Sequence, residues 1–322
     1  MTNHLKTIMC LSKVVLSNTS SGFKAREGFT QYNQTETALY APNEGLRAAM
    51  LDAGLVSDVV IIPDGQIHRF KSDGDKKQDS WYVFYGDGGA FGNWRTSLRE
   101  TWFRGDLNDD RKREIRKDVV ATQKAAREKT AQQHLRTAAT ARRRWDAAKP
   151  ATEHPYLTAK NVQSHGLRIE GTNLLIPMWH VQRLWSLQTI AVDGDGDGFR
   201  KRFMWRGRKK DCYLPIGTPG QRIWLAEGYA TAATVHEVTG DCVVCAFDAS
   251  NLIKVAATIR PLFIEREVYI AADNDDAGIK AAQDAMKQHD LEGWIAPDNW
   301  KTDWNDHCAS YGKEQTLQEL LK

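Results

Sequence analysis

Two short acidic stretches, each directly after an apolar run, constrain the fold of this chain more than any other feature. The first is residues 225–228, which contain Glu227, and the second is residues 271–278, which contain Asp273 and Asp275. Each follows strand-like residues and precedes a segment with a helical pattern, so each places carboxylates at the C-terminal end of a strand. Open α/β sheets bind ligands at that edge. The sequence therefore predicts an acidic site at the edge of a parallel sheet.

The spacing of these acids indicates a metal site. Asp273 and Asp275 are two residues apart on an extended segment and point to one side, and a parallel neighbour adds Glu227. Converging carboxylates repel one another unless a divalent cation neutralises them, and Mg²⁺ is the usual choice with phosphate substrates. Taken singly, either motif is more often a loop carboxylate or a helix cap, but their order and context favour metal binding. Asp276 is a candidate cap for the next helix.

These motifs resemble the TOPRIM domain, which is shared by bacterial-type primases, type IA and II topoisomerases and some nucleases. Further stretches are similar to the primases of phages, plasmids and integrated elements, so the resemblance covers roughly residues 60 to 306. They are residues 64–70, 81–84, 92–95, 154–157, 174–178, 201–203 and 216–217.

The resemblance and the alternation of strand and helix patterns together predict an α/β fold, α+β overall. We expect an N-terminal segment (1–55) with a mobile leader, a small antiparallel β module (56–105), a long basic helical linker (106–149), a β-rich primase subdomain (150–220) and a TOPRIM domain (221–322) with a parallel sheet covered on both faces. The predicted C-terminal strands are 223–225, 242–247, 268–272 and 294–296, and the predicted helices are 229–238, 252–261 and 278–289. In the linker, a sparse apolar stripe of Ile115, Val119, Leu135 and Trp145 predicts light packing.

The resemblance also implies roles for individual residues. Glu227, Asp273 and Asp275 would hold Mg²⁺ or Mn²⁺ and carry the chemistry. Asp303 would be an outer ligand, and Asp306 would cap the terminal helix. Replicative primases similar to this chain carry a second acid four positions after the Glu, where this chain has Thr231, and this leaves the number of metal ligands open.

A basic, aromatic-rich hairpin at residues 199–210 is the densest positive cluster of the chain. Such a run is usually a solvated face, but by resemblance it would hold nucleoside triphosphates and template phosphates near the metal. Arg202 and Lys209 are the leading candidates. The remaining ones are Lys201, Arg206 and Lys210.

The N-terminal β module contributes candidates for stacking on single strands, although most of its aromatic residues are as readily core. They are His68, Arg69, Trp81, Tyr85, Trp94 and Arg95. The absence of paired cysteines before residue 200 predicts no zinc ribbon, and no zinc is expected. Residues 242–245 have Cys-x-x-Cys spacing but a buried-strand pattern, and we interpret them as core. Residues 193–198 resemble the start of a calcium loop, but Met204 occupies its twelfth position, which favours a hairpin turn.

Charge and composition narrow the class of protein. Residues 221–322 hold 9 Lys and Arg against 17 Asp and Glu, whereas the first 220 hold 35 against 24. A basic part that neutralises phosphates beside an acidic part that holds cations suits a nucleic-acid enzyme, although solvated faces also differ by chance. Five scattered cysteines are typical of a protein in the reducing cytoplasm. No apolar run is long enough to span a membrane, so no membrane is expected as a partner.

Together, these observations and the resemblance predict a DNA primase of a mobile genetic element. Such an enzyme makes short primers on single-stranded DNA from nucleoside triphosphates by two-metal nucleotidyl transfer. A separate replicative helicase is the expected partner. The alternatives are a TOPRIM nuclease that uses the same metals and a non-catalytic adaptor that binds single-stranded DNA in replication. A topoisomerase requires a further breakage domain with a nucleophilic tyrosine.

Overall fold

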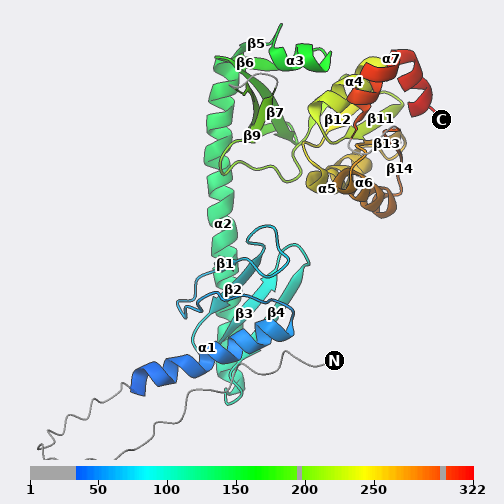
Figure 1. Cartoon of the computed structure of the whole chain (residues 1–322). Coiled ribbons are helices and arrows are strands. Elements are labelled where there is room, and N and C mark those ends of the chain that lie inside the picture. Colours follow the sequence, from blue (N-terminus) through cyan, green and yellow to red (C-terminus); the bar gives the residue numbers. More distant parts are fainter. Residues whose placement is uncertain (1–33, 194–197, 298–301) are drawn as a thin grey trace, which may run out of the picture. The chain divides into compact units, whose positions relative to one another are not determined.

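The computed structural model describes residues 34–193, 198–297 and 302–322, and the chain divides into two units between Thr122 and Gln123 (Figure 1). Most of the predicted leader, the tip of the 193–198 turn and Lys301 lie outside the described residues. Within the described ranges, no helix combines the length and apolar character that a membrane span requires.

The first unit contains the antiparallel sheet that the alternating pattern predicts. Its strands pair in the order β1-β2-β3-β4, all antiparallel. They are β1 (His68–Phe70), β2 (Ser80–Phe84), β3 (Gly88–Asn93) and β4 (Leu98–Phe103). Because side chains alternate along a strand, Tyr82 and Phe84 point to one face and Trp81 and Val83 to the other.

Two helices cover these faces. Helix α1 (Gln34–Asp52) packs Leu46 and Met50 against the Tyr82 face, and helix α2 (Asp109–Ala147) packs Ile115 and Val119 against the Trp81 face. Helix α1 lies in the predicted N-terminal segment and was not foreseen, because only a few of its large apolar residues mark the buried side.

Helix α2 confirms the predicted long helix and continues into the second unit. Ile115, Val119 and Trp145 of the predicted apolar stripe are buried as expected, but the side chain of Leu135 is 41% exposed. In the second unit the buried face of α2 consists instead of Thr137, Ala138, Ala141 and Trp145. These are three and four residues apart, the spacing of one helix face. Small alanines therefore carry the contact that the sequence analysis assigned to leucine.

The second unit begins with another antiparallel sheet, in the order β5-β6-β7-β8-β9. Its strands are β5 (Lys149–Pro150), β6 (Arg168–Glu170), β7 (Asn173–His180), β8 (Arg183–Val192) and β9 (Phe199–Phe203), with helix α3 (Pro155–Lys160) between the first two. Strands β8 and β9 pair in antiparallel fashion with Val192 opposite Phe199, and residues 194–197 of the predicted turn between them lie outside the described residues.

The C-terminal sheet has the order β10-β12-β11-β13-β14, and only β10 is antiparallel. Its strands are β10 (Leu214–Ile216), β11 (Arg222–Ala226), β12 (Cys242–Cys245), β13 (Glu267–Ala272) and β14 (Glu292–Ile295). All four residues of β12 are buried, so the Cys-x-x-Cys spacing belongs to the core, as predicted. The predicted C-terminal strands and helices are all present, with ends shifted by up to three residues.

Helices cover both faces of this sheet (Figure 1). Helices α4 (Tyr229–Thr239) and α7 (Trp304–Leu320) pack on one face, and α5 (Ala249–Ile259) and α6 (Asp276–His289) pack on the other. The core under α4 also includes Leu174, Ile176 and Ile190 of the antiparallel sheet. The two sheets of the second unit therefore share one core, and this fixes β7 to β9 beside the acidic edge.

Candidate functional site

The predicted acids follow two neighbouring strands. Strands β11 and β13 pair in parallel, with Ala226 opposite Ala271. Glu227 follows β11 by one residue, and Asp273 and Asp275 follow β13. Since parallel strands end at the same edge, the three carboxylates lie at one edge of the sheet, as predicted.

Asp273 is the most perturbed of these acids. Its Oδ1 accepts a hydrogen bond from the Thr231 hydroxyl at 3.2 Å. Burial, followed by the nearby charges of Asp303 and Glu227, raises the pKa of Asp273 to about 8. Thr231, at the position where similar primases carry an acid, thus contacts the acidic site directly. The electrostatic coupling shows that Asp303 belongs to the same cluster.

Glu227 lies in a similar field. Burial is the main cause that raises the pKa of Glu227, and the charges of Asp275 and Asp248 act in the same direction. A hydrogen bond from the backbone N–H of Ala249 and the charge of Lys201 oppose that rise. Glu227 is therefore close to two acids that cap helices, Asp275 and Asp248, and to Lys201 on strand β9.

Two of the acids also cap helices, and they are not the two that the sequence analysis nominated. Asp275, not Asp276, caps α6 by accepting a hydrogen bond from the N–H of Gly278 at 2.7 Å. Asp303, not Asp306, caps α7 by accepting from the N–H of Asp306 at 2.8 Å. The reason is geometric, because a cap residue has extended backbone and directly precedes the first helical residue.

Gly278 explains the Ala-Gly pair that ends the second motif. A Cβ at this position would lie 2.7 Å from the carbonyl oxygen of Asp273. Only glycine lets the first turn of α6 approach the strand end so closely, and this close approach sets the position of the acids.

The side chains do not form a closed metal cage. Within the described residues, no three His, Cys, Asp or Glu side chains are arranged to hold an ion. Asp275 turns toward its cap and Glu227 toward the backbone of Ala249. The donor set nevertheless fits a hard divalent cation, because it consists of carboxylate oxygens whose mutual repulsion a cation relieves.

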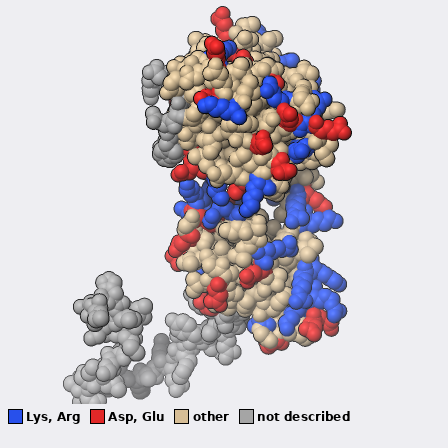
Figure 2. Space-filling model, turned by 90° about the vertical axis from the view of Figure 1, so that its right-hand side faces the viewer, with Lys and Arg blue, Asp and Glu red and all other residues tan. Residues whose placement is uncertain are grey.

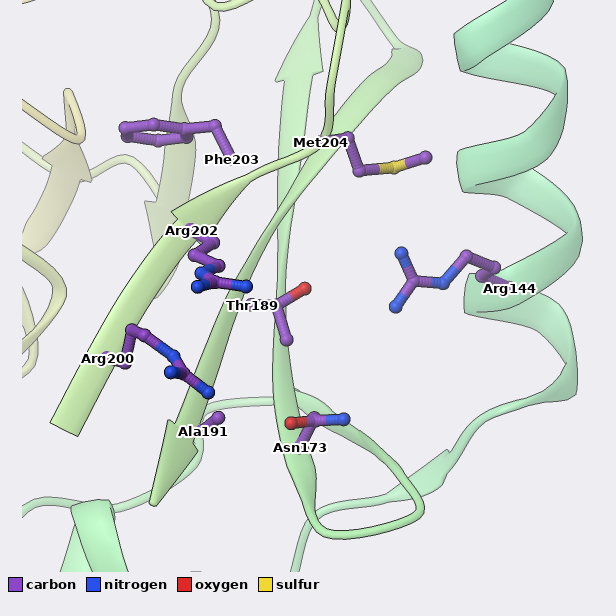
Figure 3. Close-up of a pocket in the computed structure, with 8 residues that line it drawn as sticks. All are labelled: Arg144, Asn173, Thr189, Ala191, Arg200, Arg202, Phe203 and Met204. Carbon is purple, nitrogen blue, oxygen red and sulfur yellow. The ribbon is translucent and has the colours of Figure 1, made fainter. Parts of the chain in front are cut away.

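Strand β9 sends its alternating side chains to opposite faces of the antiparallel sheet. Phe199 and Lys201 contact Tyr156, with the Lys201 Nζ 5.6 Å from the ring centroid, on the side of the acids. Arg200 and Arg202 point to the other face, toward Arg144 of α2 (Figure 3). Arg202, expected beside the acids, therefore lies on the face away from them.

The remaining basic residues of the hairpin differ in their surroundings. Lys209 pairs with Asp248, which caps α5 and neighbours Glu227. Arg206 and Lys210 are exposed, and the carbonyl of Arg206 accepts a hydrogen bond from Thr137. Figure 2 shows that Lys and Arg side chains gather in patches on the face in view, with Asp and Glu side chains scattered between them.

In the first unit, only part of the predicted stacking set is exposed. Trp81 is buried, and the Tyr85 hydroxyl hydrogen-bonds the Thr122 hydroxyl. His68 pairs with Asp64, and Arg95 pairs with Asp75. Trp94 is 50% exposed, stacks on Trp81 and carries the guanidinium of Arg69 at 4.7 Å from its ring centroid. Trp94 with Arg69 is thus the aromatic surface that remains accessible.

The sequence analysis missed Asp248. It follows β12, the strand on the other side of β11, and its position at a strand end before a helix is the same signal that revealed the other acids. Although burial acts to raise its pKa, the hydrogen bond from Lys209 and further hydrogen bonds lower it overall.

The sequence matches known proteins in agreement with this geometry. Residues 222–314 match the Toprim domain family. Two proteins from Escherichia coli, both named DNA primase TraC, are 34% identical over 231 residues and 32% identical over 262 residues. The matches cover 66% and 73% of this chain but 21% and 17% of those proteins, so the chain spans about a fifth of the relatives' length.

A solved structure, the primase fragment of the bacteriophage T7 primase-helicase protein, is 19% identical, with a TM-score of 0.42, over 55% of this chain and 77% of that one. This likeness is too distant to assign residues. Together, the family match and the TraC relatives show that residues 222–314 form a Toprim domain in a chain related to DNA primases.

Proposed function

We propose that this chain is the catalytic part of a DNA primase, which synthesises short primers on a single-stranded DNA template from nucleoside triphosphates. One observation carries the proposal. Glu227 and the Asp273–Asp275 pair end two neighbouring parallel strands, and Lys201 reaches the same edge from the adjoining sheet. Acids that bind cations beside a base that binds phosphate are what nucleotidyl transfer requires.

Toprim domains generally bind divalent metal ions, and in this chain Glu227, Asp273 and Asp275 would hold Mg²⁺ or Mn²⁺, with Asp303 as an outer ligand. A bound ion would supply positive charge that stabilises the transferring phosphoryl group and lowers the pKa of the attacking hydroxyl. The side chains of Glu227 and Asp275 accept hydrogen bonds from the N–H groups of Ala249 and Gly278, and as ligands they would exchange these contacts for the ion.

The chain's own residues account for the rest of the site. Lys201 lies close enough to influence Glu227, so its ammonium group is placed to pair with a phosphate of a nucleotide held there. Thr231 donates a hydrogen bond to Oδ1 of Asp273, so Oδ2 would be the oxygen that binds an ion. Lys209 anchors Asp248 beside Glu227 and thereby keeps this neighbouring acid paired.

The template would bind through basic and aromatic side chains. In the first unit, the exposed Trp94 with Arg69 and Arg95 offers a stacking surface flanked by positive charge. In the second unit, Arg206 and Lys210 are exposed on the hairpin. That the protein replicates a mobile genetic element and acts with a separate helicase remains a prediction from the resemblance.

One assay tests the proposal against its rivals. Purified protein is incubated with single-stranded template, labelled ribonucleotides and Mg²⁺ or Mn²⁺. Short labelled products that disappear in Glu227→Gln support a primase. Glu265→Gln is the matched control, because Glu265 is an exposed acid of the same unit outside the cluster. Cutting of the template would instead indicate a nuclease, and binding without turnover an adaptor.

A further inference from the structure

A hollow of about 300 Å³ lies on the face of the antiparallel sheet that is turned away from Lys201 (Figure 3). Arg200 and Arg202 extend into it from β9, and Arg144 faces them from α2. Among the residues that the structure describes, no acid lines this hollow. The antiparallel sheet itself separates the hollow from the acids of the C-terminal sheet.

The register of the sheet explains why the hollow exists. Thr189 lies opposite Arg202, and Ala191 lies opposite Arg200, so strand β8 contributes only small side chains between the arginines and β7. Further along the same face, Leu187 and Met204 pack with Trp145 of α2. The face thus changes from a packed apolar half to an open basic half.

The charges in the hollow are only partly compensated. Both oxygens of Glu170 accept hydrogen bonds from the Arg144 Nε, at 3.0 and 3.1 Å, so Arg144 is neutralised. Arg200 makes one ion pair of 3.5 Å with Asp193, and both side chains are about half exposed. Arg202 makes no ion pair with any described residue.

We propose that this hollow is a phosphate-binding site with Arg200 and Arg202 as its ligands. A guanidinium presents a planar fork of N–H donors that matches two phosphate oxygens. The hydroxyl of Thr189 and the amide of Asn173 offer further polar groups at the same wall. Unlike the carboxylates at the sheet edge, this site attracts phosphate without a metal ion.

The phosphate could belong to the backbone of a single strand or to a free nucleotide, and one experiment separates these sources. Binding of a fluorescent single-stranded dT12 and of ATP is measured with the full chain in EDTA, so that the acids cannot bind phosphate through a metal ion. We expect Arg200→Gln and Arg202→Gln each to weaken binding about tenfold, because each removes a charge-assisted contact. Loss for dT12 alone assigns a strand phosphate, and loss for ATP alone a nucleotide.

Two further variants make the test specific to the hollow. Ala191→Leu fills it without changing any charge and should weaken the same ligand several-fold. Arg143→Gln is the matched control, because Arg143 is exposed and adjacent to Arg144 but points away from the hollow. If Arg200→Gln and Arg202→Gln bind both ligands as well as Arg143→Gln does, the proposal is wrong. Circular dichroism confirms the fold of each variant, and the two arginine variants decide the outcome if Ala191→Leu does not fold.

Discussion

Lys201 and Arg202 are neighbours in the sequence but face opposite sides of strand β9. Lys201 lies over the ring of Tyr156 and influences Glu227 electrostatically, whereas Arg202 lines the hollow opposite α2. The alternation of side chains along a strand thus distributes one basic run between two separate surfaces. This separation makes the roles of the two residues distinguishable by experiment.

Lys201→Gln should lower the rate of primer synthesis at saturating template by roughly 10- to 100-fold, the loss expected for one charged contact to a transferring phosphate. Arg202→Gln should leave the rate nearly unchanged when template and nucleotide are both saturating, because Arg202 faces away from the acids. Steady-state kinetics with varied template and nucleotide would show the difference. Equal losses of rate in both variants would contradict the assignment of the two faces.

Asp275 has two roles that two substitutions should separate. Asn caps helices about as well as Asp, so Asp275→Asn should retain stability but lower activity by weakening the grip on the metal ion. Asp275→Ala also removes the bond to the N–H of Gly278 and should cost about 1 kcal/mol of stability. Thermal denaturation together with the primer assay would show this pattern. A fully active Asp275→Asn would remove Asp275 from the metal site.

Trp94 should contribute to template binding without supporting the core. It is half exposed, whereas its stacking partner Trp81 is buried. Trp94→Ala should weaken binding of single-stranded DNA by the equivalent of about 1–3 kcal/mol and change the melting temperature little. Trp81→Ala is the contrasting variant, and it should destabilise the first unit by about 3–5 kcal/mol. Unchanged binding in Trp94→Ala would leave the template to other surfaces.

The C-terminal sheet was predictable because its strands are short continuous apolar runs that end in acids and are followed by helices. Parallel pairing of β11 and β13 follows from that order, and it places Glu227 near Asp273 without further information. The tertiary choices were not predictable. Whether Asp275 or Asp276 caps α6 depends on one residue of helix register, which periodicity does not resolve.

The sequence also did not show which face of the sheet each side chain of the basic hairpin occupies. A run such as residues 199–204 shows which residues alternate, but not which set points toward the acids. That choice depends on tertiary packing, because Phe199 packs with Tyr156 in the core shared by the two sheets, whereas Met204 packs with Trp145 in a separate cluster on the opposite face. Helix α1 was missed for a related reason, since its buried face exists only against the β1–β4 sheet.

Asp273 should make the metal-free protein less stable as pH rises. Its pKa is about 8 in the folded chain against 3.8 as the ordinary value, so between these values the folded state holds a proton that the unfolded state has lost. The number of bound protons is then higher in the folded state, and stability falls as pH rises through this window. Asp273→Asn, which resembles the neutral acid, should therefore gain stability relative to the natural chain between pH 5 and pH 8. The gain is on the order of a few kcal/mol at most.

Melting curves in EDTA across this pH range would measure the gain in stability. Asp276→Asn is the control, because Asp276 is an exposed acid in the first turn of α6. Adding Mg²⁺ should stabilise the natural chain more at pH 8 than at pH 5, because the ion competes with the proton for the same oxygens. Melting temperatures of the natural chain and Asp273→Asn that stay parallel across the pH range would show that Asp273 is ionised in the folded protein.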